Sequence, residues 1–290
     1  MPKEPRQGPA VLGRVHQRIC ARPSGSVLLY QSRSVFLQSL SPVHPNLFHF
    51  GFLTIPTFGL LAAIGLMAAL ALSLRTSVTV GLSPDHVWNA GMFAIIAAFA
   101  LSRLLLVIAN LKSFLAYPIL LLMVPSLTPL GVLLTVIAVL AYLRVRGLPL
   151  LATLDAWAPC ATLAWAFLAV GHFAEGSDPG LPSSLPWAMR TASDSLRLHP
   201  VALYTALAAV VITLVVLRQL STRRRAGDTV AFALALCGVA QFLLTFFREP
   251  AFFDNALGKL LDPLQWVALG MIATAALLWQ QPRRQVVHAV

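Results

Sequence analysis

Residues 195–217 read SLRLHPVALYTALAAVVITLVVL, and from Pro200 onward this stretch carries no charged side chain. A helix that crosses a membrane needs roughly 20 mostly apolar residues, and the run from Pro200 approaches that length. The whole chain is 58% hydrophobic and only 11% charged, unlike an ordinary soluble domain. Hydropathy predicts about seven spans, near residues 55–74, 87–110, 119–142, 153–174, 200–217, 229–247 and 264–280, the third interrupted by Pro125 and Pro129. The predicted fold is therefore an all-α integral membrane protein, a single bundle of about seven transmembrane helices.

The net charge of +11 is distributed unequally between the two sets of loops that seven spans create. One set carries almost only cations, at Arg75, Arg144, Arg146, Arg218, Arg223, Arg224, Arg225, Arg283 and Arg284. The other set mixes Lys112, Arg190, Arg197, Arg248 and Lys259 with Glu175, Asp178, Asp194, Glu249, Asp254 and Asp262. Because excess Lys and Arg mark the cytoplasmic side, we predict a cytoplasmic C-terminus, an N-terminus outside, and outer loops at 175–198 and 248–263. This explanation of the basic charge argues against a nucleic-acid partner.

Residues 1–42 form a basic tail that conflicts with an N-terminus outside. The tail lacks the apolar core and the small-residue cleavage site of a secretory signal. We expect it to be disordered, or the natural start to lie near Val43; export of the tail despite its charge is the alternative. A membrane domain over 43–284 and a short tail over 285–290 would follow. Cys20, Cys160 and Cys237 have no disulfide or metal-ligand spacing, and no zinc or phosphate-loop motif occurs.

Ionisable side chains are costly within a span and are candidates for a functional site. Such polar residues are Arg103, Asp155, His172, Glu175, His199, Tyr204, Gln241, Arg248 and Glu249. Apart from Arg103 and Asp155 they lie toward the outer half, which predicts a site that opens to the outer leaflet. Asp155 is expected in the first turn of its helix, complementing the dipole of that helix. His172 and Glu175 are three residues apart, so on a continuing helix they share a face and could form a hydrogen-bonded pair, either a solvated pair or a functional one.

Each of these residues also has a purely structural interpretation. Arg103 can lock helix packing, Tyr204 can belong to an interfacial aromatic belt, and Pro200 suits the first turn of a helix. Arg248 and Glu249 can simply end a span. Taken one at a time, these residues therefore do not indicate a function. Their occurrence together in one chain is more informative.

Five elements of the chain, taken in order, resemble prolipoprotein diacylglyceryl transferases. They are HPNLFHFGFLTIPTFGLL at 44–61, GLSPDHVW at 81–88, RGLPLLATLDAWAP at 146–159, HPVALY at 199–204 and FFREP at 246–250. HPVALY is similar to the family motif His-Pro-x-x-Leu-Tyr-Glu as far as the tyrosine. The resemblance covers roughly residues 43–280, and five elements in the family's order are more specific than any one alone.

The resemblance implies a seven-helix bundle in the bacterial inner membrane. Members of the family move the diacylglyceryl group of phosphatidylglycerol to the lipobox cysteine of a preprolipoprotein and release glycerol phosphate. That chemistry needs a base or a positive field to make the thiolate and a cation such as Arg for the leaving phosphate. The implied partners are phosphatidylglycerol, the lipobox segment and the membrane, and neither a metal nor an organic cofactor is implied.

The chain departs from the family pattern at several site positions. The signature Gly-Arg-x-Gly-(Asn or Cys)-Phe-x-Asn-Gly aligns with residues 168–176, where Gly171, Phe173 and Gly176 are retained. Residues that differ from the family's are Phe58, Thr128, Ala169, Glu175, Thr205, Cys237, Gln241 and Thr245. Ala169 replaces the phosphate-binding Arg, and Thr128 lies where the family has its His. These changes remove cations and proton-transfer groups, and each lost donor typically costs about 10²–10³ in rate.

New residues could compensate for these losses. The candidate catalytic residues are His199, His172, Glu175 and Tyr204; the candidate phospholipid-binding residues are Arg103, Arg197 and Arg248; Gly59, Gly171, Gly176 and Pro200 are expected to shape turns and helix packing. The main hypothesis is a divergent transferase with a rearranged site. The alternatives are a degenerate paralogue that binds phospholipid or lipoprotein without transfer, and a transferase with an altered substrate.

Overall fold

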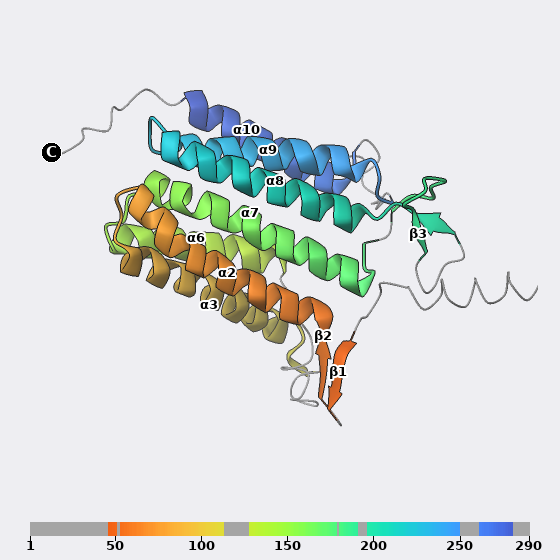
Figure 1. Ribbon diagram of the computed structural model, residues 1–290. Coiled ribbons are helices and arrows are strands. Elements are labelled where there is room, and N and C mark those ends of the chain that lie inside the picture. The colour runs from red at the N-terminus through yellow and green to blue at the C-terminus, as the bar shows by residue number, and fades with distance from the viewer. Residues whose placement is uncertain are drawn as a thin grey trace, which may run out of the picture. The chain divides into compact units, whose positions relative to one another are not determined.

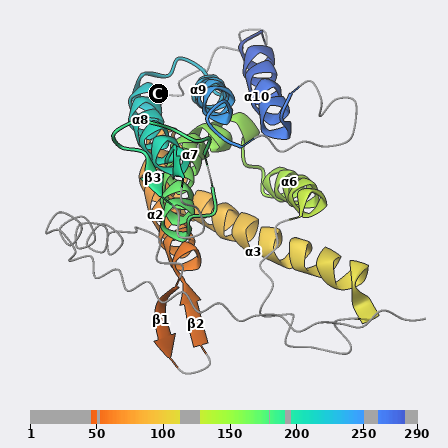
Figure 2. The same ribbon diagram turned by 90° about the vertical axis from the view of Figure 1, so that its right-hand side faces the viewer.

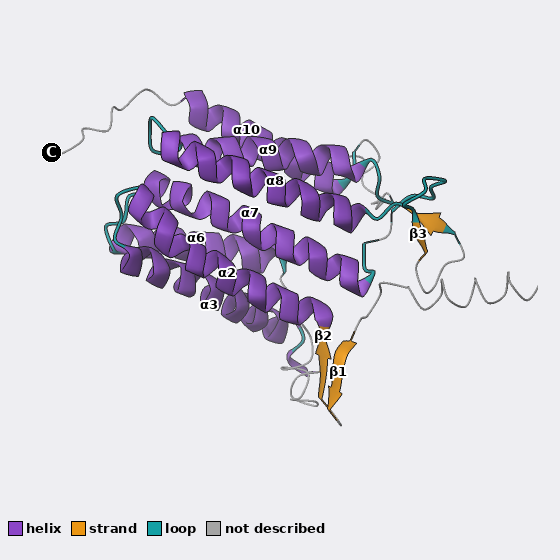
Figure 3. Cartoon of the chain, in the orientation of Figure 1, coloured by secondary structure: helices purple, strands orange, loops and turns teal. Residues whose placement is uncertain are grey.

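Seven helices make up most of the described chain (Figure 3). The computed structural model describes residues 46–50, 53–112, 128–178, 180–190, 196–249 and 261–280; the predicted tails over 1–42 and 285–290, together with Arg283 and Arg284, lie outside them. The helices are α2 (Thr57–Thr79), α3 (Pro84–Ala109), α6 (Pro129–Val145), α7 (Leu150–Glu175), α8 (Val201–Thr222), α9 (Asp228–Thr245) and α10 (Pro263–Gln280). Two short antiparallel pairs accompany them, β1 (Asn46–Phe50) with β2 (Leu53–Pro56) and β3 (Met189–Arg190) with β4 (Arg197–Leu198).

The helices have the length and surface of membrane-spanning segments. Five of them, α2, α3, α7, α8 and α9, are long and apolar enough to cross a bilayer. Their outward faces are apolar: on α8, Leu207, Val211 and Leu214 recur every three or four residues and are each about 60% exposed. A surface of this kind is stable in lipid and not in water. The chain is therefore a multi-pass membrane protein, as expected. The other two described helices, α6 and α10, are not among those long and apolar enough to cross a bilayer.

The third predicted span has different limits in the structure. The helix begins at Pro129, not near residue 119, and continues to Val145. Thr128 is its N-cap, and its side-chain oxygen accepts a hydrogen bond from the Gly131 amide at 3.1 Å. Proline is favoured in the first turn because it has no N–H to satisfy, and Thr is a good cap. Residues 113–127 lie outside the described part of the chain, so the first part of the predicted span is not compared.

Helix α7 has the largest number of helix neighbours, packing against α2, α8 and α9 (Figures 1 and 2). Helix α3 packs on α2 and α6, and α10 packs on α9. Glycines allow the close crossings: a Cβ at Gly65 of α2 would clash with Phe167 of α7, and one at Gly238 of α9 would lie 2.8 Å from the Ala268 carbonyl of α10. Small residues at crossings are typical of membrane helices, where van der Waals packing must hold helices together.

Asp155 joins four elements at one end of the bundle, and its role differs from the prediction. It lies in the second turn of α7, not the first, and its side chain is fully buried. Its carboxylate accepts hydrogen bonds from the amides of Gly227 at 2.7 Å and Val230 at 2.9 Å, and pairs with Arg223 at 2.9 Å. Arg223 also donates to the Val80 carbonyl. Asp155 thus caps α9 rather than its own helix, satisfying amides that every helix start leaves unpaired.

The opposite end of the bundle carries the segment between α7 and α8, with β3 and β4 (Figure 1). This segment is bonded to the end of α9: the Leu181 amide donates to the Phe247 carbonyl at 2.9 Å, and the His199 amide donates to the Leu181 carbonyl at 3.0 Å. Gly180 approaches the His199 carbonyl so closely that a Cβ would clash with it. These contacts hold the end of α7, the start of α8 and the end of α9 together, and the candidate site lies there.

Candidate functional site at one end of the α7–α10 cavity

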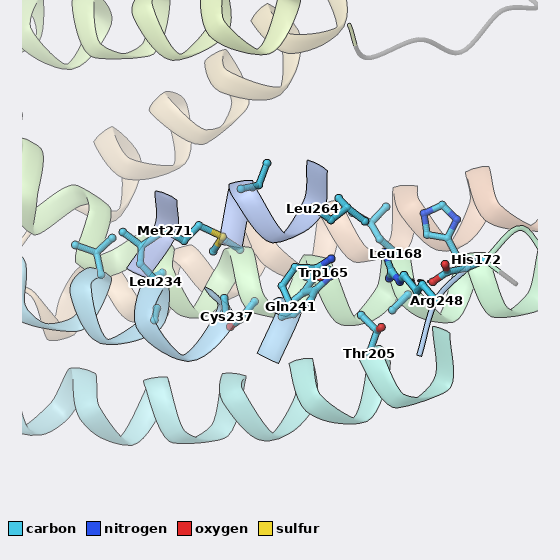
Figure 4. Close-up of a pocket in the computed structure, with 18 residues that line it drawn as sticks. Trp165, Leu168, His172, Thr205, Leu234, Cys237, Gln241, Arg248, Leu264 and Met271 are labelled. Atoms are coloured by element: carbon cyan, nitrogen blue, oxygen red, sulfur yellow. Dashed lines mark ion pairs between the residues drawn. The ribbon is translucent and has the colours of Figure 1, made fainter. Parts of the chain in front are cut away.

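A cavity of about 530 Å³ is lined by residues of α7, α8, α9 and α10 (Figure 4). Most of its wall is apolar and includes Leu234, Val267 and Met271. His172, Asp178, Thr205 and Arg248 form what we call the polar end of the cavity. Figure 4 shows His172, Thr205 and Arg248 gathered on one side, away from Leu234 and Met271. An apolar cavity with a few convergent polar groups is the usual form of a small-molecule site.

Arg248 and Asp178 carry the only full charges among the described residues that line the cavity. An Nη2 atom of Arg248 lies 2.9 Å from a carboxylate oxygen of Asp178, and each side chain is 18% exposed. The Nε atom of Arg248 is buried and has no hydrogen-bond partner in the described structure. A buried donor of this kind normally finds a protein, water or ligand acceptor. The guanidinium therefore keeps donor capacity beyond its bond to Asp178.

His172 lies on the last turn of α7 and is held by the turn that follows it. Gly176 ends the helix with φ of +71°, a conformation that glycine adopts at low cost. The reversal brings the Ser177 amide to within 3.2 Å of the His172 carbonyl, and Ser177 Oγ to 2.8 Å from His172 Nδ1. The ring of Phe58 lies against the imidazole at 4.7 Å between centroids. Among the described contacts the partner of the imidazole is Ser177, and no hydrogen bond joins His172 to Glu175.

Half of the positions where the sequence departs from the family pattern line this cavity. Ala169, Thr205, Cys237 and Gln241 all line it. Phe58 contacts His172. Thr128 lies apart from the cavity lining and caps α6. Glu175 and Thr245 are not among the lining residues, so four of the eight departing positions lie at the cavity.

His199 and Tyr204 form a second, aromatic group beside the cavity, and neither is among its lining residues. His199 Nδ1 is 3.4 Å from the Tyr204 hydroxyl, and the Trp187 indole N–H donates to the same hydroxyl at 2.7 Å. Phe247 contacts both rings, at 5.4 Å from His199 and 6.2 Å from Tyr204 between centroids. The sequence gives no signal for Trp187, because it lies in a Pro- and Ser-rich loop that only the fold brings to Tyr204.

Other candidate residues lie apart from the cavity or serve packing. Arg103 is on α3, which contributes no lining residue, and Arg197 is exposed on β4. Gly171 lets α7 approach α2, since a Cβ there would lie 2.9 Å from Phe58. Pro200 is the N-cap of α8. Within the described residues no group of three His, Cys, Asp or Glu side chains could hold a metal ion.

Besides Trp187, the sequence did not identify Asp178 and Ser177 as residues of this region. Both follow the end of α7 in a turn, where no helical periodicity relates them to other residues. The acidic character of the outer loop was the only available signal for Asp178. Its partner Arg248 lies just after the end of α9, and no local sequence pattern connects the two residues.

Comparison with known proteins places these features in a family. The sequence pattern of the family described as prolipoprotein diacylglyceryl transferase matches residues 45–280. Similar proteins named phosphatidylglycerol–prolipoprotein diacylglyceryl transferase occur in Verminephrobacter eiseniae (36% identity over 53% of this chain and 58% of that protein) and Paracidovorax citrulli (35% over 53% and 60%). A third, from Clostridium tetani, is 26% identical over 70% of this chain and 85% of its own length. The chain spans about three-fifths of the first relatives' length, and its match to the family pattern runs from before β1 to the end of α10. The chain belongs to the prolipoprotein diacylglyceryl transferase family.

Proposed function

We propose that this chain transfers a diacylglyceryl group from a phospholipid to the thiol of a lipobox cysteine in a preprolipoprotein. Phosphatidylglycerol is the donor in the names of its relatives. In the reaction a C–S bond forms at the glycerol carbon and the C–O bond to phosphate breaks. The thiol proton is taken up by a base, and glycerol phosphate leaves. The observation that carries the proposal is the apolar cavity with a single ionic end, within the region that matches the family.

The polar end of the cavity offers groups for both halves of this reaction. Arg248 can bind the phosphate, because a guanidinium fork matches phosphate oxygens. His172 is the candidate base for the thiol proton, since its Nδ1 is engaged by Ser177 and its other nitrogen stays available. Glu175 makes no described bond to His172 and is left with a supporting electrostatic role. His199 and Tyr204 shape the loop beside the cavity, together with Trp187.

The proposed setting is the bacterial inner membrane, with the polar end of the cavity facing the outer leaflet. The supporting observation is charge. The end of the bundle that holds Asp155 carries Arg75, Arg144, Arg146, Arg218, Arg223, Arg224 and Arg225. The end that holds the cavity's polar residues mixes Arg197 and Arg248 with Glu175, Asp178, Glu249 and Asp262. The positive-inside rule then assigns the first end to the cytoplasm.

Complementation tests the function. The full chain is expressed in a bacterium depleted of its own diacylglyceryl transferase, and growth and lipid attachment to a reporter lipobox cysteine are measured. We expect rescue by the wild type, and a loss of roughly 10²–10⁴-fold in attachment rate for His172→Ala, as for removal of a general base. His86→Ala is the matched control, because His86 is exposed at the start of α3.

Two outcomes would contradict the proposal. Absence of rescue by a chain that is present and inserted in the membrane would favour binding without transfer. Rescue by both wild type and His172→Ala at equal rates would remove His172 from the chemistry and leave the transfer itself standing.

A further inference from the structure

Below the polar end, the mostly apolar wall of the cavity carries three side chains with hydrogen-bond donors: Thr162 and Trp165 of α7 and Gln241 of α9. The Thr162 hydroxyl is already used, since it donates to the Pro159 carbonyl at 3.0 Å and accepts a bond from Thr213 at 2.9 Å. Within the described residues, the indole N–H of Trp165 and the side-chain amide of Gln241 have no hydrogen-bond partner. We call these two groups the N–H pair.

The N–H pair lies at one depth in the cavity. Trp165 precedes His172 by seven residues, and His172 belongs to the polar end. Gln241 precedes Arg248, also of the polar end, by the same number. At the rise of an α-helix, each member of the pair lies roughly 10 Å below the polar end. The helices α7 and α9 pack against each other, and Figure 4 shows Trp165 and Gln241 between Cys237 and the polar end.

Donors in a membrane-spanning segment are costly unless they find an acceptor. An amide that leaves water without a new hydrogen bond loses about 1–3 kcal/mol in protein interiors. The neighbouring wall residues Leu234, Leu264 and Val267 have no acceptor in their side chains. Polar groups within a membrane span therefore usually serve a ligand or a partner, and the ligand of this cavity has to supply acceptors at the depth of the N–H pair.

A diacylglyceryl lipid has acceptors at that depth. Its two ester carbonyls lie a few bonds from the phosphate, on the side of the acyl chains. With the phosphate on Arg248 and the chains along the apolar wall, the carbonyls lie between the polar end and Cys237. The long side chains of Arg248 and Gln241 can close part of the distance between their backbone positions. An ether-linked lipid has the same phosphate and chains and lacks both carbonyl acceptors.

We propose that Trp165 and Gln241 bind the two ester carbonyls of the phosphatidylglycerol donor, so that this cavity selects an ester-linked lipid over an ether-linked one. The inference rests on the proposed function in taking this cavity as the site of the lipid donor. It assigns the residues that recognise the diacylglyceryl part. An ether analogue leaves both N–H groups unpaired, and a site built to hydrogen-bond a substrate group rejects an analogue without that group for this reason.

Lipid competition tests this assignment without any transfer reaction. The full-length protein is reconstituted in nanodiscs that contain equimolar dipalmitoyl phosphatidylglycerol and its dihexadecyl ether analogue, which have the same head group and chain length. Native mass spectrometry after gentle detergent extraction counts the two lipids, which differ in mass. We expect the wild type to retain the ester about three- to tenfold better than the ether, the equivalent of one net hydrogen bond.

Variants of the N–H pair identify the residues responsible. Gln241→Leu and Trp165→Phe each remove one donor and should lower the preference for the ester, and the double variant should retain the two lipids equally. Gln219→Leu and Trp279→Phe are the matched controls, because neither residue lines the cavity, and they should keep the wild-type ratio. Thermal unfolding of each variant checks that it is folded. If the double variant does not fold, the wild type and the two single variants decide the same question.

The outcomes separate the two proposals. Equal retention of the two lipids by the wild type, or an unchanged preference in the Gln241 and Trp165 variants, would overturn the recognition of the ester carbonyls. Retention of neither lipid by the wild type would overturn it as well. Preferential retention of the ester by a chain that fails to complement would contradict only the transfer reaction. Rescue by a chain that retains both lipids equally would contradict only the role of the N–H pair.

Discussion

Asp155 is a buried carboxylate whose partners all lie on other elements. It caps the first turn of α9 and pairs with Arg223 after α8, which in turn holds the last turn of α2 through Val80. A buried charge left without its partner is strongly destabilising, typically by 3–5 kcal/mol. Asp155 is not a lining residue of the cavity and lies at the end of the bundle opposite the polar end, so we expect it to affect stability more than lipid recognition.

We expect Asp155→Ala to lower the free energy of unfolding by about 3 kcal/mol, since it leaves Arg223 and two amides without their acceptor. Unfolding in mixed detergent micelles, followed by tryptophan fluorescence, measures this. Asp85→Ala is the control, because Asp85 is an exposed carboxylate in the first turn of α3, and it should change stability by roughly 0.5 kcal/mol or less. Equal effects of the two variants would contradict the role assigned to Asp155.

The sequence predicts only part of the turn that follows His172. The sequence marks His172 as a candidate site residue. It also predicts a turn at Gly176, because glycine after a helix is a common stop signal. The choice of Ser177 over Glu175 as partner follows from the reversal itself, which carries Ser177 back over the last turn of α7. The three-residue spacing of His172 and Glu175 describes a continuing helix, so it does not predict which residue the turn at Gly176 brings to the imidazole.

At the scale of the helix, the crossing of α9 and α10 forms one wall of the cavity. Gly238 sits at the crossing, with the Ala268 carbonyl and the Ile272 side chain both 2.8 Å from where a Cβ would be. The neighbouring turns of the same two helices supply Gln241 and Val267 to the cavity lining. The separation of these helices therefore determines how wide the cavity is.

We expect Gly238→Leu to destabilise the protein by roughly 1–3 kcal/mol through overpacking, and to reduce lipid retention by displacing α10. Gly270→Leu is the matched control on α10: a Cβ there meets nothing within 4 Å, and leucine is the better helix former by somewhat less than 1 kcal/mol. Thermal unfolding in detergent and native mass spectrometry of bound lipid give the two readouts. A Gly238→Leu variant as stable as Gly270→Leu would show that the crossing is not tight.

At the scale of the whole molecule, orientation in the membrane follows from the charges at the two ends. Excess arginine keeps a loop in the cytoplasm during insertion. We expect a cysteine introduced at Ser184, in the loop between α7 and α8, to react with a membrane-impermeant maleimide in intact spheroplasts. A cysteine at Ser221, at the end of α8 that carries Arg218, Arg223, Arg224 and Arg225, should react only after lysis.

Both reporter positions are exposed, so access to water and not burial decides the labelling. The experiment uses a Cys20→Ser background, while Cys160 and Cys237 are buried and need no replacement. Labelling of Ser221→Cys in intact spheroplasts, with none at Ser184→Cys, would reverse the proposed orientation.

The amino-acid sequence is enough to predict the class of fold, the approximate positions of the helices and the family. Hydropathy, charge bias, Pro at helix starts and short motifs are sums or patterns over neighbouring residues, so they need no tertiary information. The start of α6 at its Thr128 cap comes from the structure, because an apolar window does not detect a helix cap.

Which side chains come into contact depends on how the helices pack. Asp155 and Arg223 are 68 residues apart, and Asp178, which follows α7, pairs with Arg248, which follows α9. Such pairs depend on how each helix is rotated against its neighbours, and close packing at small residues such as Gly65 and Gly238 sets that rotation. The cavity and its ionic end are properties of that packing, and no local stretch of sequence contains them.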